Sequence, residues 1–425
     1  MDKLNSIKAE AKRFFKESVL EQKLKIGPSL KIEYKDMVCQ QLDKILSKLL
    51  KQSKIDIEEQ EFNILKEELI AEVVGYGILE KLIRDPEITD ILVNGLNQIY
   101  IEKKGKLEKL DLKFDSKEEL LFTIERMMVD SGKRVNTSSP FVDFNLGTGA
   151  RVTVVIPPVS PSTPLFCIRK LLKGILNIED LVKFGTLNRK LLDFFKYSIK
   201  ARLNILITGS TGAGKSTLMN LLIREFIPKD ERIVIIEDTQ EIVIDESCHF
   251  IRLITRSPNI ERRGEITLRD LVKLSLHLRP DRIIIGEVRG EEAFHFLHAV
   301  NTGHEGSMCT IHANNSEDAL NRLETLALMD RPNLHSSVIR HFLKSGIDFI
   351  IHMTRFPSGQ RVVSQVSEFD YKGNSCIIKD IFSLKRSVKN NKEIFEIKST
   401  GHTPSFIDKL KVGSDIPADF FNIKS

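Results

Sequence analysis

The first part of the chain has apolar residues at helical spacing. They recur three or four positions apart, which predicts the buried faces of two amphipathic helices. These positions are Val38, Leu42, Ile45, Leu46 and Leu49, followed by Phe62, Leu65, Leu69 and Val73. Residues 1–74 are therefore expected to form an N-terminal helical segment, in which the two helices pack on each other.

The next region mixes short alternating runs with a single helical stretch. Alternation on both sides of the Lys104–Gly105 pair predicts a hairpin, and a second hairpin is expected over residues 142–158. Between them lies a helical pattern that Gly132 would end. Residues 75–170 therefore predict a separate α+β domain, and residues 171–190 are expected to be a linker.

From residue 191 onward the apolar runs become short and continuous. Three of them, at 203–209, 232–236 and 282–285, are separated by helical stretches. Continuous apolar strands are typical of parallel sheets that are covered on both faces. Residues 191–425 therefore predict an α/β domain, which closes with a hairpin around Pro357 to Gly359 and a late helix.

Composition limits the class of protein. Of the 425 residues, 41% are hydrophobic and 29% are charged, which is ordinary for a globular protein. No run approaches the roughly 18 apolar residues of a membrane-spanning helix. The five cysteines are scattered without a CxxC pair, which favours a reducing compartment over a disulfide framework or zinc ribbon. We therefore expect a cytoplasmic protein.

The positive charge is concentrated near the N-terminus. The whole chain carries a net charge of +5, and residues 1–55 hold 13 Lys and Arg against 7 Asp and Glu, so the remainder is nearly neutral. A basic segment of this kind could rest on an anionic membrane surface or an acidic partner. It could equally be the solvated face of a helix.

The strongest chemical signal is a phosphate loop, which fits the G-x-x-x-x-G-K-[ST] pattern between a strand and a helix. Its residues are Gly209, Ser210, Thr211, Gly212, Ala213, Gly214, Lys215, Ser216 and Thr217. Glycines let backbone N–H groups turn toward phosphate oxygens, and the helix N-terminus adds its dipole. Lys215 is expected to reach the β- and γ-phosphates of ATP, and the Ser216 hydroxyl is expected to ligate Mg²⁺.

Acidic residues follow two of the apolar strands. Glu237, Asp238 and Glu241 come after one, and Glu287 follows another, with Arg289 close behind. The carboxyl ends of parallel strands face the ligand crevice. Glu287 is therefore the candidate to position and polarise the attacking water, and Asp238 and Glu287 could hold Mg²⁺ through water. Singly, such acids are also common as helix caps or solvated groups.

Two histidines lie in the stretch from Thr302 to Asn314. His304 precedes a predicted strand and His312 ends it. At ~3.3 Å per strand residue the imidazoles should be roughly 20 Å apart, which is too far to share a metal ion. His312 would reach the same edge as Lys215 and Glu287 and could contact a γ-phosphate or the water. The alternative for each histidine is a hydrogen bond within the core.

These four segments, in this order and spacing, resemble the boxes of the type II/type IV secretion ATPase superfamily, the traffic ATPases. The boxes are a phosphate loop, an acidic box, a Walker B segment ending in Gly-Glu, and a histidine box. Four further segments look like the Tad/Flp pilus assembly branch. These are residues 138–158, 166–170, 255–273 and 399–410. The likeness runs from about residue 36 to residue 412.

The resemblance implies a RecA-like P-loop ATPase C-terminal domain and a homohexamer that binds ATP between the two domains of each subunit. Relatives of this kind drive pilus assembly or secretion through inner-membrane platform proteins, so the protein would be peripheral at the inner membrane. Carried over, Glu287 is the catalytic glutamate and Glu237 and Glu241 are the acidic-box residues. His304 and His312 are the histidine-box residues.

The resemblance also places arginines of the N-terminal domain near the γ-phosphate. Arg151 and Arg169 match best, and Arg134 is a weaker match. A surface ion pair is the alternative for each. Two other functions remain open at this point, a nucleic-acid translocase or conjugative transfer ATPase on the same core, and a regulatory nucleotide-binding scaffold without hydrolysis. The chain has no Trp and its excess charge lies outside the ATPase region, so no nucleic-acid partner is expected.

Overall fold

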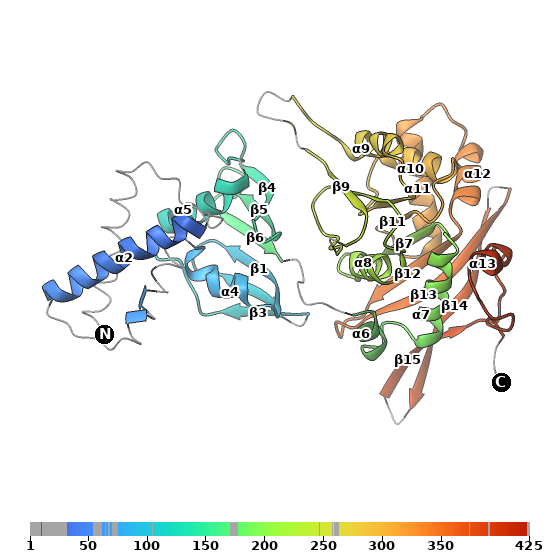
Figure 1. Ribbon diagram of the computed structural model, residues 1–425, viewed down its shortest axis with the longest axis horizontal. Helices are drawn as coiled ribbons and strands as arrows, with labels where there is room; N and C mark the ends of the chain where they lie inside the picture. Colours follow the sequence, from blue (N-terminus) through green and yellow to red (C-terminus); the bar gives the residue numbers. More distant parts are fainter. Residues whose placement is uncertain are drawn as a thin grey trace. The chain divides into compact units, whose positions relative to one another are not determined.

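The computed structural model divides the chain into two compact units, Met1–Ile175 and Leu176–Ser425, each with its own sheet (Figure 1). The described residues are 10, 32–53, 62–63, 65–66, 69, 75–103, 105–131, 133–170, 177–245, 247–256, 258, 263–373, 375–389 and 392–422. The predictions for the rest of residues 1–31, for most of the second N-terminal helix and for Gly132 lie outside them.

The first unit contains a six-stranded sheet in the order β3-β2-β1-β6-β5-β4, in which every neighbouring pair is antiparallel. Both predicted hairpins are present in it, as β2–β3 and β4–β5. The elements are α2 (Ile32–Ser53), η1 (Gly77–Leu79), α4 (Glu80–Arg84), β1 (Ile88–Asn94), β2 (Ile99–Lys103), β3 (Lys106–Leu110), α5 (Lys117–Met128), η2 (Val129–Ser131), β4 (Phe141–Asn145), β5 (Arg151–Val155) and β6 (Leu165–Arg169).

The helices of this unit follow from their patterns. The predicted apolar face of α2 is buried at Leu42, Leu46 and Leu49. In α5 the Ser116 side chain caps the helix by accepting a hydrogen bond from the Glu119 N–H, and Leu120 is fully buried in the core. The helical segment and the sheet belong to the same compact unit.

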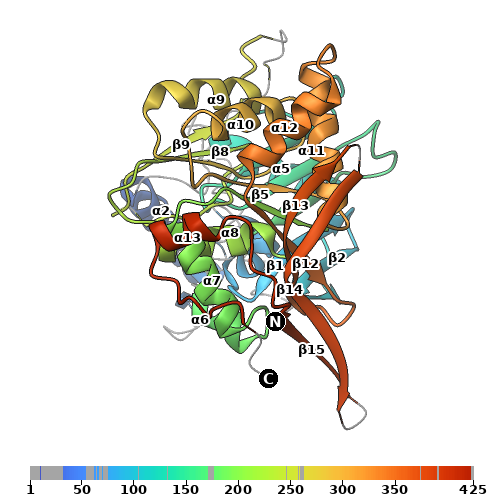
Figure 2. The same ribbon diagram turned by 90° about the vertical axis from the view of Figure 1, so that its right-hand side faces the viewer.

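The second unit is built on a nine-stranded sheet in the order β15-β14-β13-β12-β7-β11-β10-β8-β9. Strands β12 to β9 in this order run parallel, and β13, β14 and β15 continue the sheet as long antiparallel strands (Figure 2). The strands are β7 (Ile205–Gly209), β8 (Ile233–Glu237), β9 (Phe250–Ile254), β10 (Arg282–Ile285), β11 (Met308–Ile311), β12 (Phe349–Arg355), β13 (Arg361–Lys372), β14 (Ser375–Lys389) and β15 (Lys392–Ser399).

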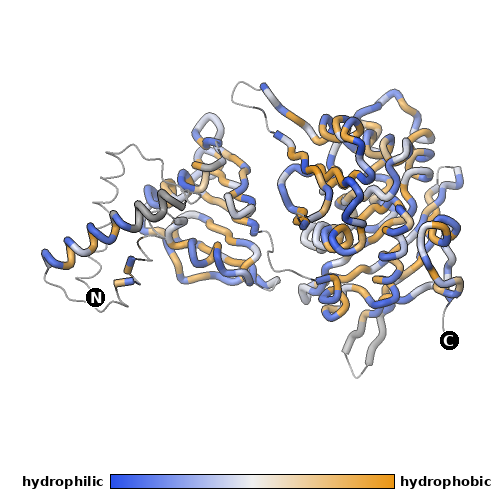
Figure 3. The backbone as a smooth tube through the Cα atoms, viewed as in Figure 1, coloured by the Kyte–Doolittle hydropathy of each residue, from blue (hydrophilic) through white to orange (hydrophobic). Residues whose placement is uncertain are grey.

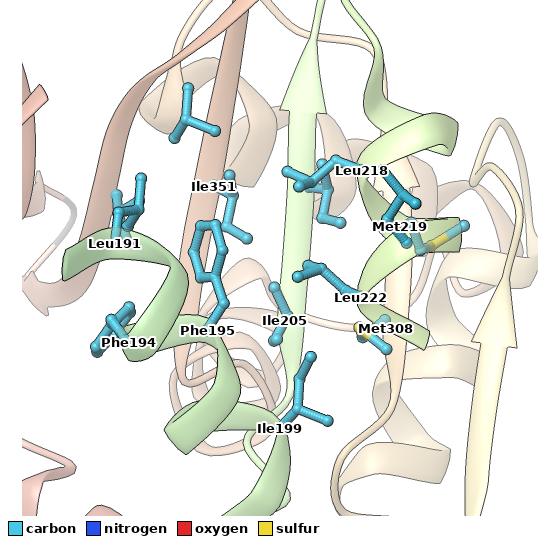
Figure 4. Packing of buried hydrophobic residues seen from close by; sticks show 14 of the residues in the cluster. Leu191, Phe194, Phe195, Ile199, Ile205, Leu218, Met219, Leu222, Met308 and Ile351 are labelled. Carbon is cyan, nitrogen blue, oxygen red and sulfur yellow. The ribbon is translucent and has the colours of Figure 1, made fainter. Parts of the chain in front are cut away.

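Helices cover both faces of this sheet, which is why its central strands are apolar throughout (Figure 3). On one face α7 and α8 pack over β7 and β12 (Figure 4). On the other, α9 to α12 cover β8, β10 and β11. The helices are α6 (Ile178–Lys183), α7 (Arg189–Lys200), α8 (Lys215–Phe226), α9 (Leu268–Ser275), η3 (Leu276–Leu278), α10 (Glu292–Val300), α11 (Ser316–Asp330), α12 (Ser336–Gly346) and α13 (Ile407–Gly413).

The core of the second unit reaches back into the region predicted as a linker. Ile178 and Leu181 of α6, together with Leu187, are buried in the same cluster as β7 and α8. The second unit therefore begins before residue 191, because α6 has an apolar face of its own. The α/β class predicted for this part of the chain is confirmed. Among the helices of the described part, none combines the length and apolar character that a membrane crossing requires.

Candidate active site

The phosphate loop connects β7 to α8 with a backbone that only glycine accommodates. Gly209 has φ +149°, Gly212 has φ +71° and Gly214 has φ +98°. A Cβ atom on Gly209 would also overlap the carbonyl oxygen of Met353 on the neighbouring strand β12. These left-handed and close-packed positions let the loop turn from the strand directly into the helix that begins at Lys215.

Lys215 is buried at the start of α8, with only 6% of its surface exposed. Its Nζ donates to the carbonyl oxygens of Gly209 and Ser210 at 3.0 and 3.1 Å and lies 3.1 Å from His312 Nδ1. Burial lowers the pKa of Lys215 to about 8, against the opposing effect of Glu287 and Glu241. The amine is therefore still charged near neutral pH. Its partners are two carbonyl oxygens and one imidazole nitrogen, none of which carries a negative charge, so an anion could replace them.

His312 lies between Lys215 and Glu287. A lysine ammonium can only donate, so His312 Nδ1 is the acceptor and the proton of the ring belongs on Nε2, which lies 3.0 Å from Glu287 Oε1. Burial and the charge of Lys215 lower the pKa of His312. The imidazole is thus neutral in this arrangement. It accepts a hydrogen bond from the lysine and donates one to the carboxylate.

Glu287 continues the chain of contacts toward Asp238. Arg289 Nη2 donates to Glu287 Oε2 at 2.6 Å, and Arg289 Nη1 lies 3.5 Å from Asp238 Oδ2. Burial alone would raise the pKa of Glu287, but Arg289, His312 and Lys215 outweigh it and hold that pKa below its ordinary value. Glu287 is therefore an anion near neutral pH, suited to orienting a polar molecule rather than keeping a proton.

Glu237 ends β8 and is almost completely buried, with 2% exposure. Its Oε1 accepts from the backbone N–H groups of Glu241 and Ile242 at 2.8 Å, whereas Oε2 has no hydrogen-bond partner and lies 3.5 Å from Arg252 Nε. Burial raises the pKa of Glu237 to about 7 despite these donors. The side chain fits because Gly286 leaves room, since a Cβ there would lie 3.1 Å from Glu237 Cγ.

The donor set at this edge suits Mg²⁺, which prefers oxygen ligands and keeps several of its own waters. The Ser216 hydroxyl and the carboxylates of Asp238 and Glu287 could hold it, directly or through water. Glu237 Oε2 also fits, because it is buried and accepts no hydrogen bond from the residues that the structure describes, with only the Arg252 guanidinium 3.5 Å away, so a cation or its water would complete it. Glu241 is exposed, and its backbone N–H rather than its side chain contacts Glu237.

Residues 72–398 match the family model of the type II/IV secretion system proteins, which spans more than half of the chain. The chain belongs to the type II/IV secretion system protein family. It is 32% identical over 314 residues to the type IV secretion system protein PtlH of Bordetella pertussis, covering 67% of this chain and 91% of PtlH. It is 34% identical over 228 residues to the conjugal transfer protein TrbB of Rhizobium radiobacter, covering 53% of this chain and 67% of TrbB.

Two solved structures of the same kind are also similar. The VirB11 ATPase of the Brucella suis type IV secretion system is 25% identical, with a TM-score of 0.39 over 68% of this chain and 93% of that chain. The pilus retraction motor PilT with bound ADP is 19% identical, with a TM-score of 0.49 over 79% of this chain and 86% of that chain.

Within this secretion-family chain, the two histidines of the Thr302–Asn314 stretch lie at opposite ends of β11. His312 follows the strand at the phosphate-loop edge, whereas His304 precedes it and its Nδ1 lies 3.1 Å from the Ala299 carbonyl oxygen. The His304 carbonyl accepts from the Ser307 hydroxyl at 2.7 Å. His304 therefore fixes the turn before β11 and is not part of the group around Lys215.

The two predicted arginines lie on paired strands of the first unit. Arg151 on β5 is directly opposite Arg169 on β6. Arg151 Nη2 contacts Asp143 at 3.2 Å, and Arg169 Nε contacts Asp90 at 3.0 Å. The two guanidinium groups are adjacent on the sheet, and each forms an ion pair with a carboxylate, so the four charges balance.

Three further residues beside the phosphate loop come from β12 and β13 and were not singled out from the sequence. His352 is buried on β12, in register with Thr208 of β7, and its Nδ1 has no partner. Arg361 Nε donates to the Gly212 carbonyl oxygen at 2.8 Å, and Arg355 also lies against Gly212. The only signal in the sequence was that an arginine stands on each side of the Pro357–Gly359 turn.

Proposed function

We propose that the protein hydrolyses Mg-ATP at the carboxyl edge of β7, β8, β10 and β11. The observation that carries the proposal is the continuous set of contacts from Lys215 through His312 to Glu287. It joins a phosphate-binding lysine to an ionised carboxylate through one neutral imidazole. A nucleotide in the loop would therefore have its terminal phosphate next to a group that can orient water.

Each residue has a distinct part in this proposal. Lys215 exchanges its bonds to the Gly209 and Ser210 carbonyls for phosphate oxygens, whose charge suits a buried ammonium better. Glu287 accepts a hydrogen bond from the attacking water and fixes its direction, and His312 senses the phosphate through Lys215. Bound Mg²⁺ would neutralise charge on the phosphates, held by Ser216 with Asp238 and Glu287, and Glu237 would support its shell.

We assign the protein to a motor of a pilus-assembly or protein-secretion machine of the Tad/Flp type. In this proposal it works as a homohexamer at the cytoplasmic face of the inner membrane, with platform proteins as partners. Family membership and the sequence segments shared with that branch support the assignment. Arg151 and Arg169 would supply positive charge to the γ-phosphate of a nucleotide, which stabilises charge developing in the transition state.

The test is phosphate release by the purified chain. Glu287→Gln should keep ATP binding and lower turnover by about 10²–10³-fold, because the phosphate loop is unchanged while a neutral amide orients the water and supports Mg²⁺ less well than a carboxylate. Lys215→Ala should lose both nucleotide affinity and turnover. Normal hydrolysis by the Glu287→Gln chain would reject the assignment of this carboxylate.

Arg169 has its own test. Arg169→Ala should lower turnover by about tenfold or more with little change in ATP affinity. Lys109→Ala, a change at an exposed cation on β3 of the same unit, serves as the control. Unchanged turnover in Arg169→Ala would remove this arginine from the site.

The relatives' names favour one alternative function. TrbB is a conjugal transfer protein, so an ATPase of conjugative transfer is the second candidate. Such a protein could act on DNA directly or only on the secretion machine. ATP hydrolysis measured with and without single-stranded DNA separates the two, since stimulation by DNA would favour a translocase.

A further inference from the structure

The turn end of the hairpin formed by β12 and β13 lies against the phosphate loop from Gly209 to Gly214. Met353 is in register with Gly209, and Arg355 is directly opposite Arg361 across the hairpin. A Cβ atom on Gly212 would lie 3.0 Å from Arg355 Nη1, and one on Gly214 would lie 3.4 Å from Arg361 Cδ. All three glycines with positive φ in the loop therefore face this one hairpin.

A hydrogen bond from Arg361 joins the hairpin to the loop. Arg361 Nε donates to the carbonyl oxygen of Gly212 at 2.8 Å. Hydrogen bonds from a charged donor are roughly twice as strong as neutral ones, so this contact holds the Gly212 peptide more firmly than a backbone bond would. The aliphatic part of Arg361 packs against Gly214 in addition.

The same hairpin also contacts the loop that follows α6. The Val363 N–H donates to the Thr186 carbonyl oxygen at 2.8 Å, and Gln360 Nε2 would lie 3.4 Å from a Cβ on Gly185. Thr186 is buried and Leu187 is in the core. Val363, two residues after Arg361, is therefore hydrogen-bonded to the loop that follows α6. This loop lies near the start of the second unit, which begins at Leu176.

We propose that Arg361 is a positioning residue that couples nucleotide occupancy of the phosphate loop to the Gly185–Leu187 loop. The proposal rests on nucleotide binding at this site. Phosphates would take Lys215 away from the Gly209 and Ser210 carbonyls and redirect the N–H groups of the loop. Because Arg361 holds the Gly212 carbonyl oxygen, the hairpin moves when the phosphate loop changes conformation. The hydrogen bond from the Val363 N–H to the Thr186 carbonyl oxygen then moves the segment that leads toward the first unit.

The experiment compares hydrogen exchange of the full chain with and without Mg-ADP, in peptides that cover 178–188 and 353–366. In the natural chain both peptides should change their exchange rates by about threefold or more on nucleotide binding. Arg361→Met keeps the aliphatic stem against Gly214 but removes the donor. In this variant the response of 178–188 should be lost, while binding of fluorescent ADP weakens by less than about fivefold.

Two further variants complete the test. Arg361→Lys restores a cationic donor on a flexible stem and should recover at least part of the response. Lys379→Ala, at an exposed cation on β14 of the same sheet, should respond as the natural chain does. If Arg361→Met does not fold, the comparison of Arg361→Lys with the natural chain decides, and a weaker response is expected there because the fixed Nε–H geometry is missing.

Two results would overturn the inference. An equal response of 178–188 in the natural and Arg361→Met chains would make Arg361 a static support of the loop. A natural chain that binds ADP without any change at 178–188 would remove the coupling itself. Failure of the natural chain to bind ADP at all would reject the proposed function as well, so the binding titration tells the two failures apart.

Discussion

The two ends of the parallel strands in the second unit both bury charged side chains, but they treat them differently. At the amino end Arg282 is fully buried and every contact is made, with Glu231 and with the carbonyl oxygens of Gly306 and Ile199. At the carboxyl end Glu237 Oε2 accepts no hydrogen bond within the described part of the chain and has only a 3.5 Å contact with Arg252 Nε. The charged group at the amino end is therefore fully hydrogen-bonded, and the one at the carboxyl end is not.

The neighbours of each group repeat this difference. At the amino end the Ser307 hydroxyl donates to the His304 carbonyl and accepts from the Ile283 N–H. At the carboxyl end the Thr208 hydroxyl and His352 Nδ1 are buried and form no hydrogen bond with any residue that the structure describes. A buried polar atom without a hydrogen bond lowers stability, so the amino end stabilises the fold more than the carboxyl end does. The unsatisfied atoms of the carboxyl end lie beside the proposed nucleotide site.

The largest loss of stability is expected from a substitution at the amino end of the strands, where Arg282 is buried. Arg282→Met removes the main partner of the half-buried Glu231, which keeps only the longer contact with Arg202 Nη1 at 3.6 Å, and it removes a donor from the Ile199 and Gly306 carbonyl oxygens. The free energy of unfolding should therefore fall by about 3 kcal/mol. Urea denaturation measures it. Adding Glu231→Met should restore part of the loss, since no carboxylate then remains beside the substituted residue, and Arg202 is exposed enough to be solvated. A loss under about 1 kcal/mol would mean that water screens this pair.

At the incomplete end Glu237 should make stability depend on pH. Its pKa of about 7 in the folded chain lies above the ordinary 4.5, so the folded state keeps a proton that the unfolded state releases. The free energy of unfolding should therefore fall as pH rises from 4.5 to 7, by about 3 kcal/mol, with no further change above 7.

Glu237→Gln removes this titration. The difference in unfolding free energy between the natural chain and this variant should change across pH 4.5–7, when both are measured by urea denaturation. Glu241→Gln, at an exposed position of the same loop, is the matched control and should keep most of the pH dependence, because the charge of Glu241 is the smallest of the causes that shift the pKa of Glu237. A natural chain and a Glu237→Gln variant with parallel pH profiles would show that Glu237 stays ionised.

The two histidines sharpen the comparison because one lies at each end of β11. His312→Gln should lower ATP turnover by roughly tenfold to a hundredfold, since it interrupts the contact between Lys215 and Glu287. His304→Gln should change turnover by less than about twofold, because its imidazole lies against the Ala299 carbonyl oxygen at the end of α10, away from Lys215 and Glu287. Steady-state phosphate release checks both, and equal losses would contradict the separation of the two ends.

The smallest effects come from single hydroxyl groups. Thr208→Val replaces an unpaired buried hydroxyl with a methyl group and should raise the unfolding free energy by about 1 kcal/mol. Ser307→Ala removes a hydroxyl with two partners and should lower it by about 1–2 kcal/mol. Thermal unfolding of the two variants measures whether each change raises or lowers stability. A change in the same direction for both would contradict the difference between the two ends of the strands.

The sequence predicted the parts of the site that depend on local pattern. The phosphate loop, the parallel strands and the acids at their ends are each encoded within a few consecutive residues, and the structure brings Lys215 and His312 together across 97 positions as the sheet topology requires. The sequence also predicted a strand between His304 and His312, and β11 carries the two side chains to opposite ends.

The contributions of β12 and β13 could not be predicted in the same way. His352 and Arg361 approach the loop only because β12 pairs with β7, and strand order is set by packing of the whole sheet rather than by local spacing. The linker prediction failed for a related reason. A short helix such as α6 has too few turns to show a clear period, and its role in the core depends on partners far along the chain.

The fully buried Cys309 in the middle of β11 gives the sheet a built-in chemical reporter. Burial raises the pKa of its thiol, so neither exposure nor ionisation makes it reactive in the folded chain. With the other four cysteines replaced by serine, a thiol reagent would modify Cys309 only in molecules whose sheet has opened. Labelling at this one position would therefore count how often β11 opens, in the same sample and under the same conditions in which turnover is measured.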